Sequence, residues 1–419
     1  MTLMMILVFG ALLILALPVG YALLIGSSLA AITAGGMPSV AAVVKIFQPT
    51  QSFPLLAIPF FMLSGNLMMG GTLGKRLIDF ATSLVGRFHG GLGQVTVVGS
   101  TVFGGVSGSA VAEASALGSM LIPWQKREGY PGAFAAAATA SSSVIAGLIP
   151  PSIPLILYAA VSNESIGALF LAGVIPGLAL CAGFMLTCYL SGRLRGFKRL
   201  ADVFTWRGLA KATLLAAPAL AMPAFIVILL RAGIATPTEV SVIAVAYGLL
   251  VSMLVYRDLS WKRFYDALVH TAVTTGVVML VIAASNLVGY VLTVESVPTA
   301  VAQWTVRTLE SPVMVILMLN LIMLVVGMFL DLPAAILLLG PTFVAIGNAI
   351  GLDLVQLGIM MAVNLSIGLF TPPVGTTLFI AAAISREKVG AIVKELWPFY
   401  LVAITVLGLV SFVPAFTVY

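Results

Sequence analysis

The chain has 419 residues, of which 61% are hydrophobic and only 8% are charged, and its mean hydropathy is +1.17. Soluble domains carry about 25% charged residues, so this composition excludes a soluble globular protein and predicts an integral protein of the lipid bilayer. The net charge of +6 does not indicate a nucleic-acid partner, because the basic residues lie in short loops between apolar runs of bilayer-spanning length.

The positions of the basic residues predict an orientation in the membrane. All Lys and Arg residues except Lys45, Arg231 and Arg307 lie in five polar breaks. Basic residues concentrate in cytoplasmic loops, so all five breaks are expected in the cytoplasm. They are residues 74–91, 124–130, 193–211, 257–266 and 385–395.

The first half of the chain contains a predicted re-entrant hairpin and a predicted broken helix. Residues 92–123 are apolar but lie between two cytoplasmic breaks, so they must enter the membrane and return to the cytoplasmic side. Residues 131–160 follow as a transmembrane helix, which we expect to be broken at Pro150–Pro151. A proline inside a helix costs about 3 kcal/mol and removes a backbone donor.

The second half shows the same order of elements with the opposite direction of entry. Residues 311–346 are apolar and lie between 295–310 and 347–353, two connections with few basic residues that are expected on the outer side. This second hairpin therefore enters from outside. Residues 354–384 form a second predicted broken helix, interrupted at Pro372–Pro373.

Opposite entry of two hairpins predicts an inverted repeat, and the sequence supports one. Matching residues recur in order, about 220 residues apart, so residues 1–195 and 196–419 are interpreted as the two repeats. Applied to the N-terminus, the repeat divides residues 3–34 into two short spans, although one long span also fits the pattern. The matched residues are Pro18 with Pro237, Asn66 with Asn286, Glu113 with Asp331, and Pro150–Pro151 with Pro372–Pro373.

Each repeat therefore predicts a hairpin tip that faces a broken helix near the middle of the membrane. Non-helical backbone is tolerated at that depth only where protein or a water-filled cavity surrounds it. Broken helices offer carbonyl groups to cations and N-terminal ends to anions. Backbone and hydroxyl oxygens are hard ligands that suit sodium, so we expect at least two Na⁺ sites.

The candidate Na⁺ ligands come from the tip and the break of each repeat. For the serines at 141–143, close helix packing is the alternative interpretation. The first site is assigned to Ser107, Gly108, Ser109, Ser142, Ser143, Gly147 and Pro150, and the second to Gly327, Asp331, Asn364, Thr371, Pro372, Gly375 and Thr376.

A pocket for an organic anion is expected between the two sodium sites. Its candidate substrate-binding residues are Ser107, Ser109, Ser143, Pro151, Thr371, Pro373 and Thr376.

Two acidic residues, Glu113 and Asp331, lie deepest in apolar sequence. Carboxylates inside a membrane are costly and usually functional. Each could bind a cation, carry a proton, cap a hairpin helix or form a salt bridge, and the sequence does not choose among these roles. There is no H-E-x-x-H motif, no Walker-type phosphate loop and no Cys/His cluster, so we do not expect an enzyme.

Four long segments resemble the large membrane subunit of TRAP transporters, the tripartite ATP-independent periplasmic transporters of bacteria and archaea. The resemblance runs across essentially the whole chain in the right order. The segments are SFPLLAIPFFMLSGNLM at 52–68, FGGVSGSAVAEASALGSMLIP at 103–123, IPPSIPLILYAAVSNESIGALFLAGVIPG at 149–177 and NLSIGLFTPPVGTTLFIAA at 364–382.

The resemblance implies a sodium-coupled secondary transporter of organic acids in the bacterial inner membrane. The basic loops and the divided N-terminal segment predict that both chain ends lie on the periplasmic side. The resemblance also implies two protein partners, a periplasmic substrate-binding protein and a separate small four-helix membrane subunit. The family is thought to use an elevator mechanism, with Ser107–Ser109, Pro150–Pro151 and Thr371–Gly375 around sodium and substrate. The alternative is a stand-alone proton- or sodium-coupled anion transporter that needs no binding protein.

Overall fold

The described part of the chain consists of α-helices with short π and 3₁₀ turns and contains no strand. The structure is a computed structural model that describes residues 1–419 apart from 16, 35, 70, 198, 201–204, 310 and 418–419. Six of the described helices are long and apolar enough to cross a membrane, or seven spans if the bent segment Ser39–Met69 counts as one. The expected all-helical, multi-span membrane fold is confirmed.

The first half of the chain, down to Arg195, contains ten α-helices among its described residues. Several are short because prolines and glycines interrupt the apolar runs. The helices are α1 Thr2–Ile14, α2 Val19–Leu29, α3 Ser39–Phe47, α4 Ala57–Met69, α5 Thr72–Val85, α6 Gly91–Ser107, α7 Ala110–Arg127, α8 Gly132–Ser142, α9 Ile153–Ser162 and α10 Ile166–Arg195.

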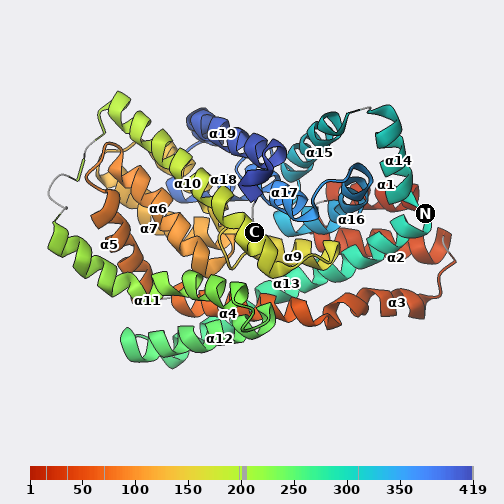
Figure 1. The fold of residues 1–419 in the computed structure, drawn as a ribbon, viewed down its shortest axis with the longest axis horizontal. Coiled ribbons are helices and arrows are strands. Elements are labelled where there is room, and N and C mark those ends of the chain that lie inside the picture. Colours follow the sequence, from red (N-terminus) through yellow and green to blue (C-terminus); the bar gives the residue numbers. More distant parts are fainter. Residues whose placement is uncertain are drawn as a thin grey trace.

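The second half follows a similar order of helices. Two of its helices, α13 and α11, are long and run through much of the molecule (Figure 1). The helices are α11 Trp206–Arg231, α12 Pro237–Leu250, α13 Trp261–Val294, α14 Val297–Thr308, α15 Pro312–Gly327, α16 Leu332–Ile350, α17 Leu354–Leu369, α18 Thr376–Ser385 and α19 Val389–Phe412.

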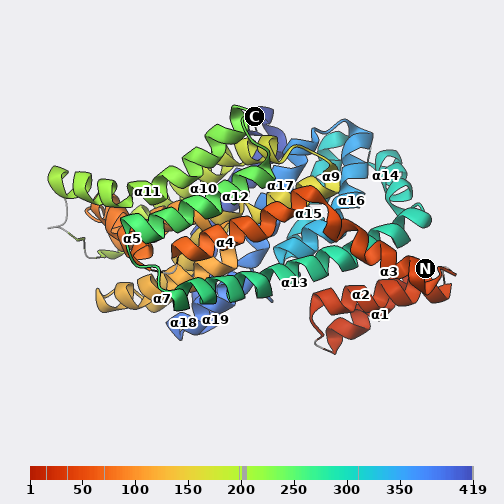
Figure 2. The ribbon, with the colours of Figure 1, turned by 90° about the horizontal axis from the view of Figure 1, so that it is seen from below.

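The N-terminal segment forms two helices that separate around Pro18 and pack against each other at one end of the molecule (Figure 2). Gly26 in α2 allows the close approach, because a Cβ there would lie 3.2 Å from the carbonyl oxygen of Met5 in α1. The structure thus has the divided form of segment 3–34 rather than one continuous helix.

Two predicted loops are wrong, because they contain helices. Residues 295–310, expected as an outward loop, contain α14, and the polar break 74–91 contains most of α5. In α5 the buried residues Leu73, Leu77 and Ala81 recur every four positions, so the helix is amphipathic and its charged residues lie on one side. The polar residues predicted as a break therefore form one face of a helix.

Parts of the expected connections fall on undescribed positions. Residues 198 and 201–204 in the break 193–211, and residue 310 at the end of 295–310, lie outside the described residues.

The segments expected as hairpins form helix pairs with short tips. Helices α6 and α7 are in contact and meet at Gly108, which has a left-handed backbone with φ of 61°. Helices α15 and α16 form the second pair. In Figure 1 the first pair lies at the left and the second at the right, with α9 and α17 between them.

Both segments expected as broken helices are interrupted at their double prolines. The first consists of α8, a 3₁₀ turn at Ser143–Gly147, and α9 after the prolines. The second consists of α17 and α18. The peptide bonds Pro150–Pro151 and Pro372–Pro373 are both cis.

Close helix crossings hold these elements together. A Cβ on Gly104 of α6 would lie only 2.7 Å from the Cα of Ala146 in the first break, and a Cβ on Gly368 of α17 would fall on the backbone of Gly327 at the end of α15. The absence of side chains at these glycines therefore determines how closely each hairpin approaches a broken helix.

We expect Gly368→Ala to lower the free energy of unfolding by about 2 kcal/mol, because the added methyl must push α15 away from α17. Gly390→Ala in α19 is the matched control, since its Cβ would meet no atom within 4 Å. Thermal unfolding in detergent measures both. Equal melting temperatures for the two variants would contradict the packing described here.

Candidate functional site

The tip of the first hairpin lies directly against the first break. A Cβ on Gly108 would collide with the carbonyl oxygen of Pro151, so only glycine allows this contact. Ser109 is the N-cap of α7, and its hydroxyl accepts a hydrogen bond from the amide of Ala112 at 3.4 Å. The amide of Ser109 in turn donates to the hydroxyl of Ser107 at 3.4 Å. The tip residues singled out in the sequence are thus brought together with the break.

The first break is fully buried and is closed by a serine that the sequence analysis did not identify. The hydroxyl of Ser152 donates to the carbonyl oxygen of Gly147 at 2.5 Å and accepts from the amide of Leu155 at 3.4 Å. Ser152 therefore spans the interruption and starts α9. The available signal was a serine directly after the double proline, followed by a proline in the first turn of the next helix.

The serines at 141–143 donate their hydroxyl groups to backbone carbonyl oxygens of their own helix. Ser142 donates to the carbonyl oxygen of Ala138 at 2.6 Å, and Ser143 donates to that of Ala140 at 3.0 Å. Such back-bonding satisfies the hydroxyl hydrogen but leaves oxygen lone pairs available. The Ser142 oxygen also accepts from the hydroxyl of Ser100 at 3.0 Å. The arrangement is compatible both with helix packing and with ligation.

The second break is bonded to the second hairpin. The amide of Val374 donates to the carbonyl oxygen of Met328, just after α15, at 3.2 Å. Thr371 donates its hydroxyl to the carbonyl oxygen of Ile367 at 2.6 Å, and the amide of Gly375 donates to that of Thr371 at 3.1 Å. Unlike Pro150 and Pro151, Pro373 is exposed.

The two broken helices cross in the core. The hydroxyl of Thr377, the second residue of α18, lies 3.1 Å from the carbonyl oxygen of Ala140 in α8 and 2.9 Å from that of Leu369 in α17. A Cβ on Gly147 in the first break would lie 3.2 Å from the hydroxyl of Ser366 in α17. Residues more than 200 positions apart in sequence therefore form one polar centre.

Three buried oxygen atoms near the second break have no hydrogen-bond partner among the described residues. They are Asn364 Oδ1, Ser366 Oγ and Thr376 Oγ1. The amide group of Asn364 is held at Asn320, with Nδ2 donating to the carbonyl oxygen at 3.0 Å and to Oδ1 at 2.8 Å. Buried polar atoms are normally paired, and free oxygen atoms of this kind are the ligand type that hard cations prefer.

The two repeat-matched acids lie in different surroundings. Glu113, in the first turn of α7, is completely buried, and among the described residues neither carboxylate oxygen has a partner within hydrogen-bond geometry, although Ser100 lies beside it. Asp331 occupies the N-cap position of α16, makes no side-chain capping bond, and is exposed on the surface of the chain. The described residues contain no group of three or more His, Cys, Asp or Glu side chains that could hold a metal ion.

A cavity begins at the first hairpin tip. A small space of about 40 Å³ is lined by Ser107, Ser109, Asn66 and His270, among others. Asn66 and His270 also line a larger cavity of about 520 Å³, which extends to Arg263. Pockets for small molecules have volumes of about 300–1,000 Å³, so the larger cavity has room for a small organic acid.

Sequence reasoning missed several of these residues. His270 lies just after the polar break 257–266 and was not among the candidate site residues, although it lines both cavities. Asn66 was identified only as a landmark of the repeat. Ser366 and Thr377 are adjacent to assigned residues, but their contacts with the first repeat depend on how the helices cross, which no local pattern indicates.

Comparison with known proteins gives a consistent result. Residues 6–416 match the family model described as "Tripartite ATP-independent periplasmic transporter, DctM component". The chain is 52% identical to the uncharacterized protein y4mL of Sinorhizobium fredii, over 100% of both chains. It is 37% identical to the C4-dicarboxylate TRAP transporter large permease protein DctM of Pseudomonas aeruginosa, over 89% of this chain and 87% of the relative.

Two further likenesses extend the comparison. The sialic acid TRAP transporter large permease protein SiaM of Vibrio cholerae is 36% identical, with 88% of this chain and 86% of the relative covered. The solved structure of the YdaH transporter of Alcanivorax borkumensis superposes with a TM-score of 0.61 at 14% identity, covering 89% of this chain and 86% of that one. This second likeness concerns the fold alone.

We expect Thr377→Val to destabilise the protein by about 1 kcal/mol, because it removes the hydroxyl that lies between two buried carbonyl groups of different helices. Thr405→Val is the matched control, since the exposed Thr405 hydroxyl donates only within its own helix, to Leu401. The melting temperature in detergent reports the difference. An equal effect of both substitutions would mean that Thr377 does not hold the crossing.

Proposed function

Because this chain belongs to the DctM component family of tripartite ATP-independent periplasmic transporters, we propose that it is the permease of a sodium-coupled importer of an organic acid. Two of the relatives are named as transporters of a C4-dicarboxylate and of sialic acid. Both solutes carry at least one carboxylate, so the proposed substrate is a small carboxylate-bearing anion. The chain's relatives are transport proteins, in agreement with the expectation that it is not an enzyme.

The observation that carries sodium coupling is the set of buried, unpaired oxygen atoms at the second break. Asn364, Ser366 and Thr376 each contribute one. The C-terminal end of α17 at Leu369 adds carbonyl groups and the negative end of a helix dipole. The first tip shares only the helix end, since α6 ends at Ser107. Sodium at the second break would satisfy oxygen atoms that have no partner among the described residues, and the first site is proposed by analogy with it.

The proposed place for the substrate is the cavity at the first tip. The N-terminal ends of α7 and α9 reach it, since Ala112 and Ile153 line its inner part. Helix N-termini attract anions through free amide groups and the positive end of the dipole. The hydroxyls of Ser107 and Ser109 and the imidazole of His270 could then orient a carboxylate. Sodium bound next to the tip would order Ser107–Ser109 and so raise the affinity for the anion.

The proposed movement is that of an elevator. Both hairpins and both broken helices pack on one another and on α10 and α19, whereas α4, α12 and α13 pack together and α2 lies against α13. The first group would move as a unit and the second would stay fixed. The family assignment supports two partners, a small membrane subunit and a periplasmic binding protein, and a location in the bacterial inner membrane. The periplasmic position proposed for both ends rests on the basic loops and the repeat in the sequence.

The driving force is adequate for this function. Two sodium ions with one monoanion carry one net positive charge inward, which yields about 2.3 kcal/mol at 100 mV. That energy corresponds to roughly a fiftyfold concentration ratio before the sodium gradient itself is counted.

We expect Ser109→Ala and Thr371→Ala to raise the sodium concentration for half-maximal uptake about tenfold, since each removes a proposed ligand worth about 1.4 kcal/mol. Thr405→Ala, remote from both breaks, should leave it unchanged. Sodium titration of uptake in proteoliposomes measures the effect. Co-purification with the small subunit should be intact for all three. Unchanged sodium dependence in both site variants would refute the assignment.

We also expect uptake to require a binding protein. Proteoliposomes that contain the large and small subunits would be supplied with labelled succinate or N-acetylneuraminate, with and without the cognate binding protein and an inward sodium gradient. Uptake should occur only when both are present. Uptake without the binding protein would instead support the stand-alone anion transporter.

A further inference from the structure

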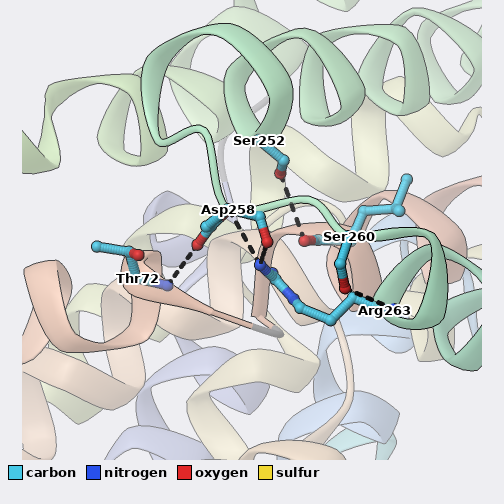
Figure 3. A network of polar contacts seen from close by, with 6 residues as sticks. Thr72, Ser252, Asp258, Ser260 and Arg263 are labelled. Atoms are coloured by element: carbon cyan, nitrogen blue, oxygen red, sulfur yellow. Dashed lines mark hydrogen bonds and ion pairs between the residues drawn. The ribbon is translucent and has the colours of Figure 1, made fainter.

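Helix α5 is the covalent link between α4 and the first hairpin, and its N-terminal end is fastened to a distant part of the chain. The carboxylate of Asp258, in the connection between α12 and α13, accepts a hydrogen bond from the amide of Thr72 at 2.7 Å. The same carboxylate forms an ion pair with Arg263, with Oδ1 and Nη1 3.0 Å apart. Figure 3 shows Asp258 between Thr72 and Arg263.

The fastening depends on a close backbone approach. A Cβ on Gly71 would collide with both the Asp258 carboxylate and the Arg263 guanidinium. Arg263 also donates to the carbonyl oxygen of Asp258, and the hydroxyl of Ser252 donates to the carbonyl oxygen of Leu67 at 3.5 Å. Several contacts therefore hold the α4–α5 turn to the α12–α13 connection.

Asp258 is charged at neutral pH. Partial burial raises the pKa of its carboxyl group, but the hydrogen bond from Thr72 and the charge of Arg263 outweigh burial, so the pKa lies below its ordinary value. The side chains of Asp258 and Arg263 are only 20% and 27% exposed. A pair this shielded, with an added backbone hydrogen bond, holds its geometry better than an exposed ion pair.

The C-terminal end of α5 is attached to helix α10. Just after α5, the backbone of Gly90 lies against Gly192 and the carbonyl oxygen of Cys188, with no room for a Cβ on either glycine. The amide of Leu200 donates to the carbonyl oxygen of Gly86 at 3.3 Å. Cys188 and Gly192 belong to α10. Helix α10 packs on α6, α8, α17 and α19, the proposed moving group.

We propose that Asp258 is a positioning residue that keeps the N-terminal end of α5 fixed to the α12–α13 connection throughout transport, so that α5 acts as a strut between the fixed and the moving groups. The inference rests on the proposed elevator function and adds a specific anchor to it. With its first turn fixed, α5 must transmit the motion by bending at its glycine-flanked ends and not by sliding. Without the contact of Asp258 with Thr72, the N-terminal end of α5 could shift and would no longer guide the movement of the first hairpin. Turnover would then slow while the binding sites stayed intact.

The test replaces the anchor by a covalent bond. Because a Cβ at position 71 would touch the Asp258 side chain, cysteines at 71 and 258 face each other. We expect Asp258→Cys alone to lower kcat of uptake about tenfold, with KM and the sodium concentration for half-maximal uptake within about twofold of wild type. In Gly71→Cys/Asp258→Cys, oxidation should restore kcat and a reducing agent should lower it again. Asp258→Glu should keep part of the rate.

Matched controls separate anchoring from folding. Gly71→Cys alone should show no change of rate on oxidation, and Asp79→Asn, at an exposed position of α5, should transport like wild type. All variants are compared in complex with the small subunit and by melting temperature. An unchanged kcat in Asp258→Cys would overturn the proposal. Loss of uptake in the oxidised Gly71→Cys/Asp258→Cys variant would also overturn it, because the contact between α5 and the α12–α13 connection would then have to open in each transport cycle. Absence of sodium- and binding-protein-dependent uptake in wild type would instead contradict the proposed function.

Discussion

The structure depends on one constraint, that backbone without helical hydrogen bonds must be enclosed by protein at membrane depth. Two double prolines create such backbone in this chain. The protein meets the constraint by crossing the two broken helices, so that Thr377 lies within hydrogen-bond distance of Ala140 and Leu369 and Ser366 lies against Gly147. Each break is thus covered by the other repeat.

This mutual covering also explains why oxygen atoms collect in the core. A break frees carbonyl groups, and serine, threonine and asparagine side chains near it can satisfy only some of them. Ser152 closes the first break, whereas Ser366 and Thr376 at the second keep oxygen atoms that find no partner in the described part of the chain. The same geometry that stabilises the interruption therefore leaves a set of hard ligands, and a transporter that binds sodium there would use atoms that the fold already exposes to one another.

The hairpin tips connect this core to the rest of the molecule. Gly108 allows the first tip to touch the carbonyl of Pro151, and the cavity at that tip is also lined by Asn66 and His270. These two residues belong to α4 and α13, which pack against each other outside the broken-helix core (Figure 2). The cavity therefore lies between two groups of helices, and helix α5 is the element that joins them in sequence and in space.

The order of elements was predictable because it depends on local properties. Apolar runs, basic breaks and double prolines are visible in the sequence, and their repetition about 220 residues later indicated the hairpins and the breaks. The errors were also local. Residues 295–310 and 74–91 were expected as connections but contain α14 and α5, because a short amphipathic helix and a polar loop have similar composition.

The membrane class, the family resemblance and the places where the backbone must break all follow from the sequence. Composition, proline positions and long motifs carry that information residue by residue. Helix packing adds what no local pattern indicates: Thr377 reaches Ala140, Glu113 is buried while Asp331 is exposed, and the carboxylate of Asp258 accepts a hydrogen bond from the first residue of α5. Such contacts depend on crossing angles and distances between helices far apart in the chain, which arise from packing of the whole molecule and leave no periodic signal in the sequence.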